Sequence, residues 1–134
     1  MGSFSPTQIE GLILGDECID QAAVYGEGRH FLTALLVPHW DNLRHALRAG
    51  SASDRQAADK PEEELARHPA VQALLRDRLN RALADVAGYE QVKKFLVLPR
   101  PFSVATDELT VSLKLRRTVV FEKYRAELDA LYRE

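Results

Sequence analysis

The most chemically suggestive stretch of this sequence is short and basic. Three cations, Lys114, Arg116 and Arg117, fall within four residues where a strand-like run ends and a helical pattern begins. A lysine at the rim of a short hairpin is a poor core residue, but it can contact phosphate or carboxylate oxygens where negative charge develops. A basic turn lying on the surface would have the same spacing, and spacing alone favours that simpler interpretation. Only the surrounding chain can decide between the two.

Helix signals occur along the whole chain. The phrase Ser5-Pro6-Thr7-Gln8 has the form of a capping box and predicts a short helix after it. Asp41 could cap a second helix, and the polar stretch 50–60 that follows predicts a loop. Apolar residues spaced three and four apart predict the longest helices, over 69–88 and 118–132.

Strand-like runs lie between these helices. They cover 19–25, 31–37, 92–98 and, as a hairpin turning at 105–108, residues 102–113. The run 31–37 is apolar on both faces, which is typical of a central strand. A glycine turn at 26–28 joins the first two strands, so we expect them to be antiparallel. The pattern predicts an α+β fold: a small, mainly antiparallel sheet covered by helices on both faces, with a projecting β-hairpin that carries Lys114.

Composition and charge exclude several classes of protein. The chain has 134 residues, 28% of them charged and 46% hydrophobic, so we expect residues 1–134 to form a single globular domain. Its 18 basic and 20 acidic residues argue against general nucleic-acid binding. The single cysteine, Cys18, fits a reducing compartment, and no apolar run is long enough to span a membrane. We therefore expect a cytoplasmic protein with no nucleic-acid partner and no transmembrane segment.

Several common active-site patterns are missing from the sequence. The four histidines lack metal-ligand spacing and have no cysteine cluster beside them, so no metal site is expected. The glycines at 26–28 lie between two strands and do not open a helix, so they do not form a phosphate-binding loop. The acidic run 62–64 is most simply a solvated first turn of a helix. The residues alone provide no complete active site.

Five phrases of the chain, taken in order, resemble one enzyme family. They lie at 4–10, 19–29, 31–38, 89–95 and 109–117, with Glu122-Lys123-Tyr124 following the last of them. Together they resemble the C-terminal domain of long-chain fatty-acid–CoA ligases, which belong to the adenylate-forming AMP-binding enzymes. The first phrase is similar to the family's hinge-proximal motif, and the last is similar to the motif that carries its catalytic lysine. The resemblance covers nearly the whole chain.

This resemblance implies a reaction and a role for each of the three cations. Family members join a carboxylate to the α-phosphate of ATP, giving an acyl-adenylate and pyrophosphate, and CoA then displaces AMP to form a thioester. Lys114 would be the catalytic lysine of the first step, and Arg116 and Arg117 could contact phosphates. The chain would belong to a fatty acyl-CoA synthetase that uses ATP with Mg²⁺ and CoA as co-substrates. Its C-terminal domain would reorient against its own large N-terminal AMP-binding domain between the two steps.

Departures from the family pattern keep other functions open. Val111 stands where relatives often have proline, and Thr106-Asp107-Glu108 replaces a commoner Asn-Gly turn. The large N-terminal domain is not part of the chain, so we expect the isolated chain to be inactive. Two alternatives stay open: a domain of an acyl-AMP ligase that loads a carrier protein, and a non-catalytic binding or regulatory module with this fold. Attachment to the periphery of a membrane is also left open.

Overall fold

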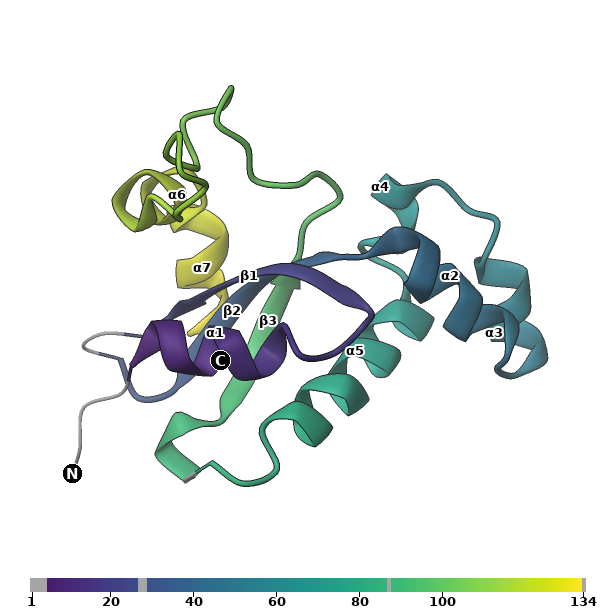
Figure 1. Ribbon diagram of the computed structural model, residues 1–134. Coiled ribbons are helices and arrows are strands. Elements are labelled where there is room, and N and C mark those ends of the chain that lie inside the picture. Colours follow the sequence, from purple (N-terminus) through teal and green to yellow (C-terminus); the bar gives the residue numbers. More distant parts are fainter. Residues whose placement is uncertain (1–4, 27–28, 87, 134) are drawn as a thin grey trace.

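The computed structural model describes residues 5–26, 29–86 and 88–133 of the chain. In order, these ranges contain α1 (Pro6–Ile13), β1 (Ile19–Tyr25), β2 (Leu32–Pro38), α2 (Trp40–Arg48), α3 (Ala52–Ala57), α4 (Glu62–Leu65), α5 (Pro69–Ala82), the 3-10 turn η1 (Gly88–Glu90), β3 (Val92–Val97), α6 (Arg117–Lys123) and α7 (Arg125–Leu131). This mixture of helices with one small sheet confirms the predicted α+β class. Figure 1 shows the sheet at the centre with helices on either side of it.

The sheet has the order β1-β2-β3, with β2 in the middle. As predicted, β1 runs antiparallel to β2, and Ala23 faces Leu35 across the pair. β3 instead runs parallel to β2, with Phe95 beside Ala34, so the sheet is mixed and not mainly antiparallel. The reason is the connection: helices α2 to α5 carry the chain across one face of the sheet, so that it returns in the same direction. The predicted turn between β1 and β2 has its residues 27 and 28 outside the described ranges.

Both faces of β2 are buried, which confirms the prediction of a central strand. Every residue of β2 is buried. Because side chains alternate between the two faces of a strand, Leu36 joins a core formed with α1 to α5. Leu35 joins a second core on the opposite face, formed with α6 and α7 through Val120 and Leu128. The two helical layers therefore have separate cores and share the sheet.

Histidine side chains begin two of the helices. The Ser5 hydroxyl accepts from the Gln8 N–H, as predicted for α1. α2, however, starts one residue before Asp41, because Nδ1 of His39 accepts from the N–H of Asn42. His68 caps α5 in the same way through the N–H of Ala70. The imidazole of His39 thus caps α2, where the sequence pattern predicted Asp41 as the cap.

Three predicted element boundaries were wrong. The expected loop 50–60 contains α3, because Ser51 and Asp54 form a reciprocal capping box. The long helix expected over 69–88 ends at Ala82, and the side chain of Gln91 then donates to carbonyl oxygens just beyond that end. The helix expected over 118–132 is divided into α6 and α7 at Tyr124. None of the helices in the described ranges is both long enough and apolar enough to cross a membrane.

The projecting hairpin is present but shorter than predicted and displaced along the chain. No regular strands form over 102–113; the pairing is a single antiparallel bridge between Leu109 and Leu115. The turn expected at 105–108 exists, since the Glu108 N–H donates to the Ser103 carbonyl oxygen, but it precedes the bridge. Residues 110–114, which we name the lysine loop, form the hairpin tip. Polar and exposed positions at this rim give the chain too little buried surface to extend the pairing.

We expect the double burial of β2 to dominate the stability of the fold. Replacing Leu35, which is fully buried, by alanine should lower the free energy of unfolding by about 2–5 kcal/mol, because it leaves a cavity between the sheet and α6–α7. Leu12→Ala on the exposed side of α1 is the matched control and should cost less than about 1 kcal/mol. Urea denaturation of the two variants measures both values. Equal losses would contradict the assignment of Leu35 to the core.

Candidate functional site

The lysine loop is closed by hydrogen bonds from Thr110. The Thr110 N–H donates to the Lys114 carbonyl oxygen (2.8 Å), and the Leu113 N–H donates to the Thr110 carbonyl oxygen (2.8 Å). The Lys114 N–H donates to Oγ1 of Thr110 (3.0 Å), and that hydroxyl also contacts the hydroxyl of Ser112 (3.1 Å). Thr110 therefore sets the backbone at Lys114 through both its main chain and its side chain.

The tip of the loop is strongly exposed and partly apolar. Val111 is 90% exposed and Leu113 is 69% exposed, and Lys114 is also exposed. Within the described ranges, no carboxylate lies within ion-pair distance of the Lys114 ammonium. The loop thus presents a positive charge together with exposed apolar side chains and leaves that charge available for a ligand.

Leu113 has an unusual backbone conformation. Its φ of 65° lies in the left-handed region, which is unfavourable for a residue with a Cβ atom. The conformation is held by the hydrogen bond between Leu113 and Thr110. A sequence pattern does not reveal this, because the signal for a left-handed position is glycine or asparagine. The strained residue lies directly before Lys114.

A buried carboxylate supports the first end of the lysine loop. The side chain of Glu108 is 3% exposed, and its carboxylate is paired with the ammonium of Lys123 on α6 (3.1 Å). The same carboxylate accepts from the hydroxyl of Thr106, while the main-chain carbonyl of Glu108 accepts from the Arg116 N–H (2.8 Å). The hydrogen bond that Lys123 donates to Glu108 raises the pKa of Lys123. Glu108 thus joins both chain segments of the hairpin to α6.

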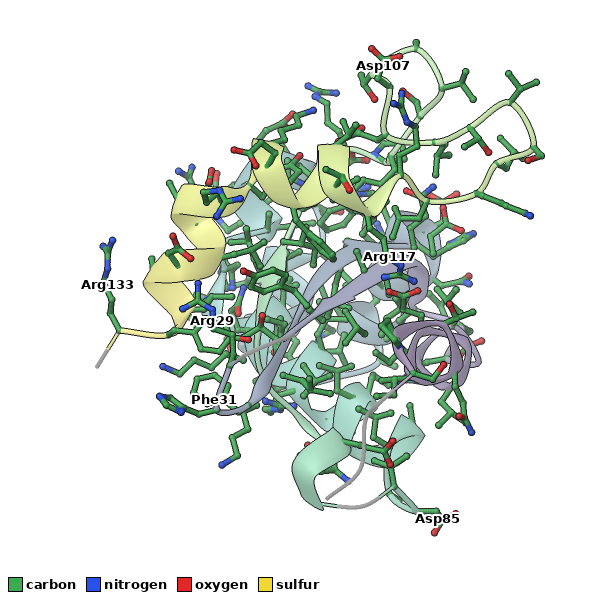
Figure 2. The ribbon with its side chains drawn as sticks, turned by 90° about the vertical axis from the view of Figure 1, so that its left-hand side faces the viewer. Arg29, Phe31, Asp85, Asp107, Arg117 and Arg133 are labelled. Carbon is green, nitrogen blue, oxygen red and sulfur yellow. The ribbon has the colours of Figure 1, made fainter. Side chains whose placement is uncertain are left out.

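A second ion pair supports the other end of the loop. Arg117 donates from both terminal nitrogens to the two carboxylate oxygens of Glu10 on α1, at 2.6 and 2.7 Å. One oxygen of Glu10 also accepts from the buried N–H of Val24 on β1 (2.7 Å). Figure 2 shows Arg117 directed toward α1, away from the outer turn that carries Asp107. Sequence reasoning missed this partner because Glu10 and Arg117 are 107 positions apart.

Of the three predicted site residues, two face the loop region and one does not. Lys114 forms part of the exposed tip, and Arg116 lies at its base with only a 3.7 Å contact to the exposed Asp107. The guanidinium of Arg117 is occupied by Glu10 instead. A phosphate contact by Arg117 stays a prediction, and it would have to use nitrogen–hydrogen bonds that Glu10 leaves free.

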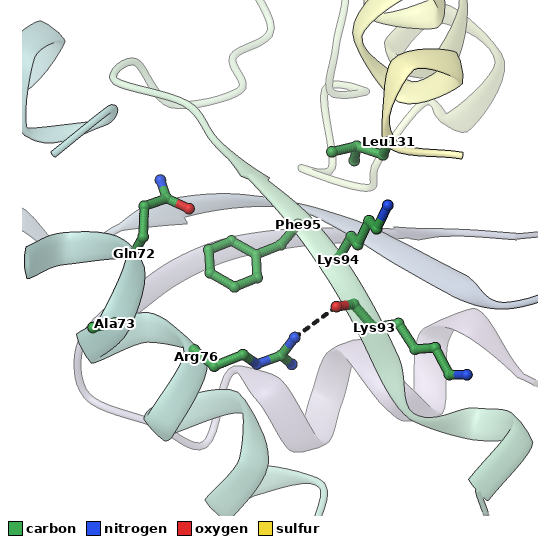
Figure 3. A pocket seen from close by; sticks show the side chains of 7 residues that line it. All are labelled: Gln72, Ala73, Arg76, Lys93, Lys94, Phe95 and Leu131. Carbon is green, nitrogen blue, oxygen red and sulfur yellow. Dashed lines mark hydrogen bonds between the residues drawn. The ribbon is translucent and has the colours of Figure 1, made fainter. Parts of the chain in front are cut away.

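Another basic hollow lies beside β3, apart from the lysine loop. Its volume is about 430 Å³, and it is lined by Gln72, Ala73, Arg76, Lys93, Lys94, Phe95 and Leu131. As Figure 3 shows, Arg76 donates to the carbonyl oxygen of Lys93 (2.7 Å). Burial lowers the pKa of Arg76, whose guanidinium also lies over the ring of Phe95. Arg76 therefore serves to bind α5 to the start of β3.

The part of the chain that the structure describes contains no group of three histidine, cysteine or acidic residues suited to a metal ion.

Comparison with known proteins assigns this fold to a class of enzyme domain. The chain belongs to the family of AMP-binding enzyme C-terminal domains, because the model of that family matches residues 2–134. It is similar to the putative fatty-acid–CoA ligase fadD11 of Mycobacterium tuberculosis, with 32% identity over 131 residues, which is 97% of this chain and 22% of the relative. It is also similar to the long-chain-fatty-acid–CoA ligase FadD15 of the same organism, with 28% identity over 130 residues, 97% of this chain and 21% of the relative. The resemblance seen in the sequence is confirmed.

Solved structures give the same result for the fold. The adenylation domain of the carboxylate reductase from Mycobacterium chelonae matches with a TM-score of 0.73 and 29% identity, over 94% of this chain and 17% of that one. The adenylation domain of carboxylic acid reductase from Segniliparus rugosus matches with a TM-score of 0.74 and 23% identity, over 96% of this chain and 18% of that one. The chain thus spans about a fifth of the length of the proteins it matches.

Leu113 offers a direct test of the loop conformation. Leu113→Gly removes the left-handed penalty of about 1–2 kcal/mol and loses some of that gain to chain entropy, so the free energy of unfolding should rise by up to about 1 kcal/mol. Leu113→Val keeps an apolar side chain but is β-branched, and it should lower the same quantity by about 1 kcal/mol. Urea denaturation measures both. A valine variant as stable as the unmodified chain would show that Leu113 is not left-handed.

Proposed function

We propose that this chain acts as the mobile C-terminal domain of an ATP-dependent fatty acyl-CoA synthetase, with Lys114 as the lysine for acyl-adenylate formation. The observation that carries this proposal is the state of Lys114: an exposed ammonium on a hydrogen-bonded loop, with no counter-charge among the described residues, in a chain that belongs to this family. The ligase activity in this proposal is inferred from the relatives, which are named as fatty-acid–CoA ligases.

The chemistry of adenylation explains why one free ammonium is useful. A fatty-acid carboxylate is already a nucleophile, but it must approach the negatively charged α-phosphate of ATP. A lysine ammonium between them can contact carboxylate and phosphate oxygens together, and it lowers their repulsion as negative charge develops on the phosphate oxygens. Pyrophosphate, held with Mg²⁺ as part of the substrate, leaves as the acyl–phosphate bond forms. Losing a contact of this kind typically costs about 10²–10³ in rate.

The second half-reaction needs Lys114 to move away. CoA must reach the acyl-adenylate, and AMP must leave as the thioester forms. Because Lys114 lies on a loop tied to the small domain by two ion pairs, rotation of that domain would carry the lysine with it. The matching proteins are about five times longer, and we assign the large domain, the acyl site and most of the ATP site to the part this chain lacks. We therefore expect no ligase activity from the chain alone.

Arg116 is the second residue that we place near substrate. Its side chain is 45% exposed, and its contact with Asp107 is long and solvated, so it can turn toward a phosphate at little cost. The acyl acceptor in this proposal is CoA, and it has one competing alternative. Adenylation is common to CoA ligases and to carboxylate reductases, and the adenylation domain of one such reductase is 29% identical to this chain. A carrier-protein acceptor is thus the main alternative, and it keeps the same role for Lys114.

Lys114→Ala in the ligase that contains this chain tests the proposal. Pyrophosphate release should fall by about 10²-fold or more, because the charge facing the phosphate is lost. Thioester formation from supplied acyl-adenylate and CoA should be largely kept. Lys60→Ala removes an exposed lysine with only a surface partner, Glu64, and is the matched control that should leave both rates unchanged.

Three results would contradict parts of this proposal. If Lys114→Ala leaves both rates near those of the unmodified enzyme, the loop is a basic surface turn and the chain acts as a non-catalytic module. If acyl-adenylate forms but CoA does not accept the acyl group while a carrier protein does, the acceptor is wrong and the adenylation role stands. If the isolated chain releases pyrophosphate, the large domain is not required.

A further inference from the structure

We infer that Arg117 is a positioning residue that holds Lys114 through Glu10, and not a ligand of the substrate phosphates. The inference rests on the proposed role of Lys114 in adenylation. It concerns the ion pair between α1 and the first turn of α6, which links the two ends of the chain. Of the three cations in this stretch, Arg117 makes a structural contact within the domain, whereas Lys114 and Arg116 are left to contact the substrate.

The contacts of Glu10 are those of a structural carboxylate. Its side chain is 10% exposed, and both of its oxygens accept from Arg117 at 2.6 and 2.7 Å. One of them also accepts from the N–H of Val24 within β1. This arrangement fixes the guanidinium plane through two parallel hydrogen bonds, which is the strongest form of arginine–carboxylate pairing.

Moving Arg117 out of this ion pair costs free energy. If it turned to a substrate phosphate, the nearly buried carboxylate of Glu10 would keep only the Val24 N–H and lose its counter-charge. Arg117 itself is 32% exposed, but removing it from the pair is unfavourable, because the buried carboxylate of Glu10 would then be neither well hydrated nor paired. Arg116 has the opposite surroundings, since among the described residues its one charged contact is a long one to the exposed Asp107. The two adjacent arginines therefore have different roles.

The position of Arg117 in the chain connects this pair to Lys114. Arg117 is the first residue of α6 and follows Lys114 by three positions. It therefore fixes the point at which the chain leaves the lysine loop and enters α6. The entry of the loop is fixed separately by the pair between Glu108 and Lys123. Because Glu10 belongs to α1, any rotation of α1 is passed to the lysine loop without an intervening flexible segment. α1 and Lys114 should therefore move as one body.

A double-mutant cycle in the ligase that contains this chain tests the inference. The variants are Glu10→Gln, Arg117→Met and the two combined. Glu10→Gln keeps an oxygen that can accept from the Val24 N–H, so the fold should be retained. Each single change should lower kcat for adenylation by about 10- to 100-fold, because a displacement of about 1 Å at a reacting group can cost that much. The double variant should be no slower than the slower single variant.

Two readouts separate positioning from phosphate binding and from simple loss of stability. KM for ATP should change by less than about twofold, and thioester formation from supplied acyl-adenylate should be nearly unaffected. Arg117→Lys, which keeps a charge for Glu10, should recover part of the adenylation rate. Arg125→Met breaks an exposed arginine–glutamate pair that does not contact the loop, and it should leave both half-reactions unchanged.

The outcomes are distinguishable from failure of the proposed function. If Arg117→Met raises KM for ATP while Glu10→Gln does not, Arg117 binds phosphate and this inference is overturned. If Lys114→Ala blocks adenylation but neither Glu10→Gln nor Arg117→Met slows it, the positioning role alone is wrong. Adding Arg117→Met to Lys114→Ala should slow adenylation no further, since Arg117 acts through Lys114. If Lys114→Ala itself has no effect, the proposed function is wrong.

Discussion

The constraint on which this structure depends is that one short strand, β2, must be buried on both faces. Its residues leave no side that can face water, so the sheet needs a helical layer on each face. The first layer is supplied by α1 to α5, and the second comes only from α6, α7 and the segment before them. The lysine loop is the last segment before this second layer. Its place at the rim of the sheet therefore follows from the need to cover Leu35 and its neighbours.

Beyond the edge of the hydrophobic core, ion pairs hold the chain in place. The lysine loop has one bridge and no buried side chain of its own between residues 110 and 114. Its two ends are held instead by Glu108 with Lys123 and by Glu10 with Arg117, and each pair has a nearly buried carboxylate. Exposed ion pairs contribute little to stability, but a buried carboxylate with additional hydrogen bonds fixes geometry. The loop is thus firmly attached at both ends while its tip stays in solvent.

The sequence was sufficient for the class of fold and for the centre of the sheet, because periodic burial is a local signal. The double apolar face of 31–37, the cap at Ser5 and the start of α5 at Pro69 could be read directly. What it could not provide were partners that are close only in three dimensions. His39 and His68 act as helix caps, although imidazole is not a usual capping group, and Arg117 meets a carboxylate from the other end of the chain. The left-handed conformation of Leu113 was also hidden, because a hydrogen bond to Thr110 within the loop holds it there against the preference of leucine.

The surroundings of Lys114 also favour a partner surface over a role in free solution. Val111 and Leu113, which precede it in the lysine loop, expose apolar side chains, and exposed apolar area costs about 25 cal/mol per Å² relative to burial. In water, the field of the ammonium is weakened by the solvent, and two unit charges 4 Å apart interact by only about 1 kcal/mol. A surface that covered Val111 and Leu113 would remove water from the same place and strengthen every interaction of Lys114 with an anion. Under the proposed function, closure of a second domain over the tip would bury the apolar side chains and strengthen the free charge at the same time. This supports a lysine that acts in one domain arrangement and is inert when the domains separate.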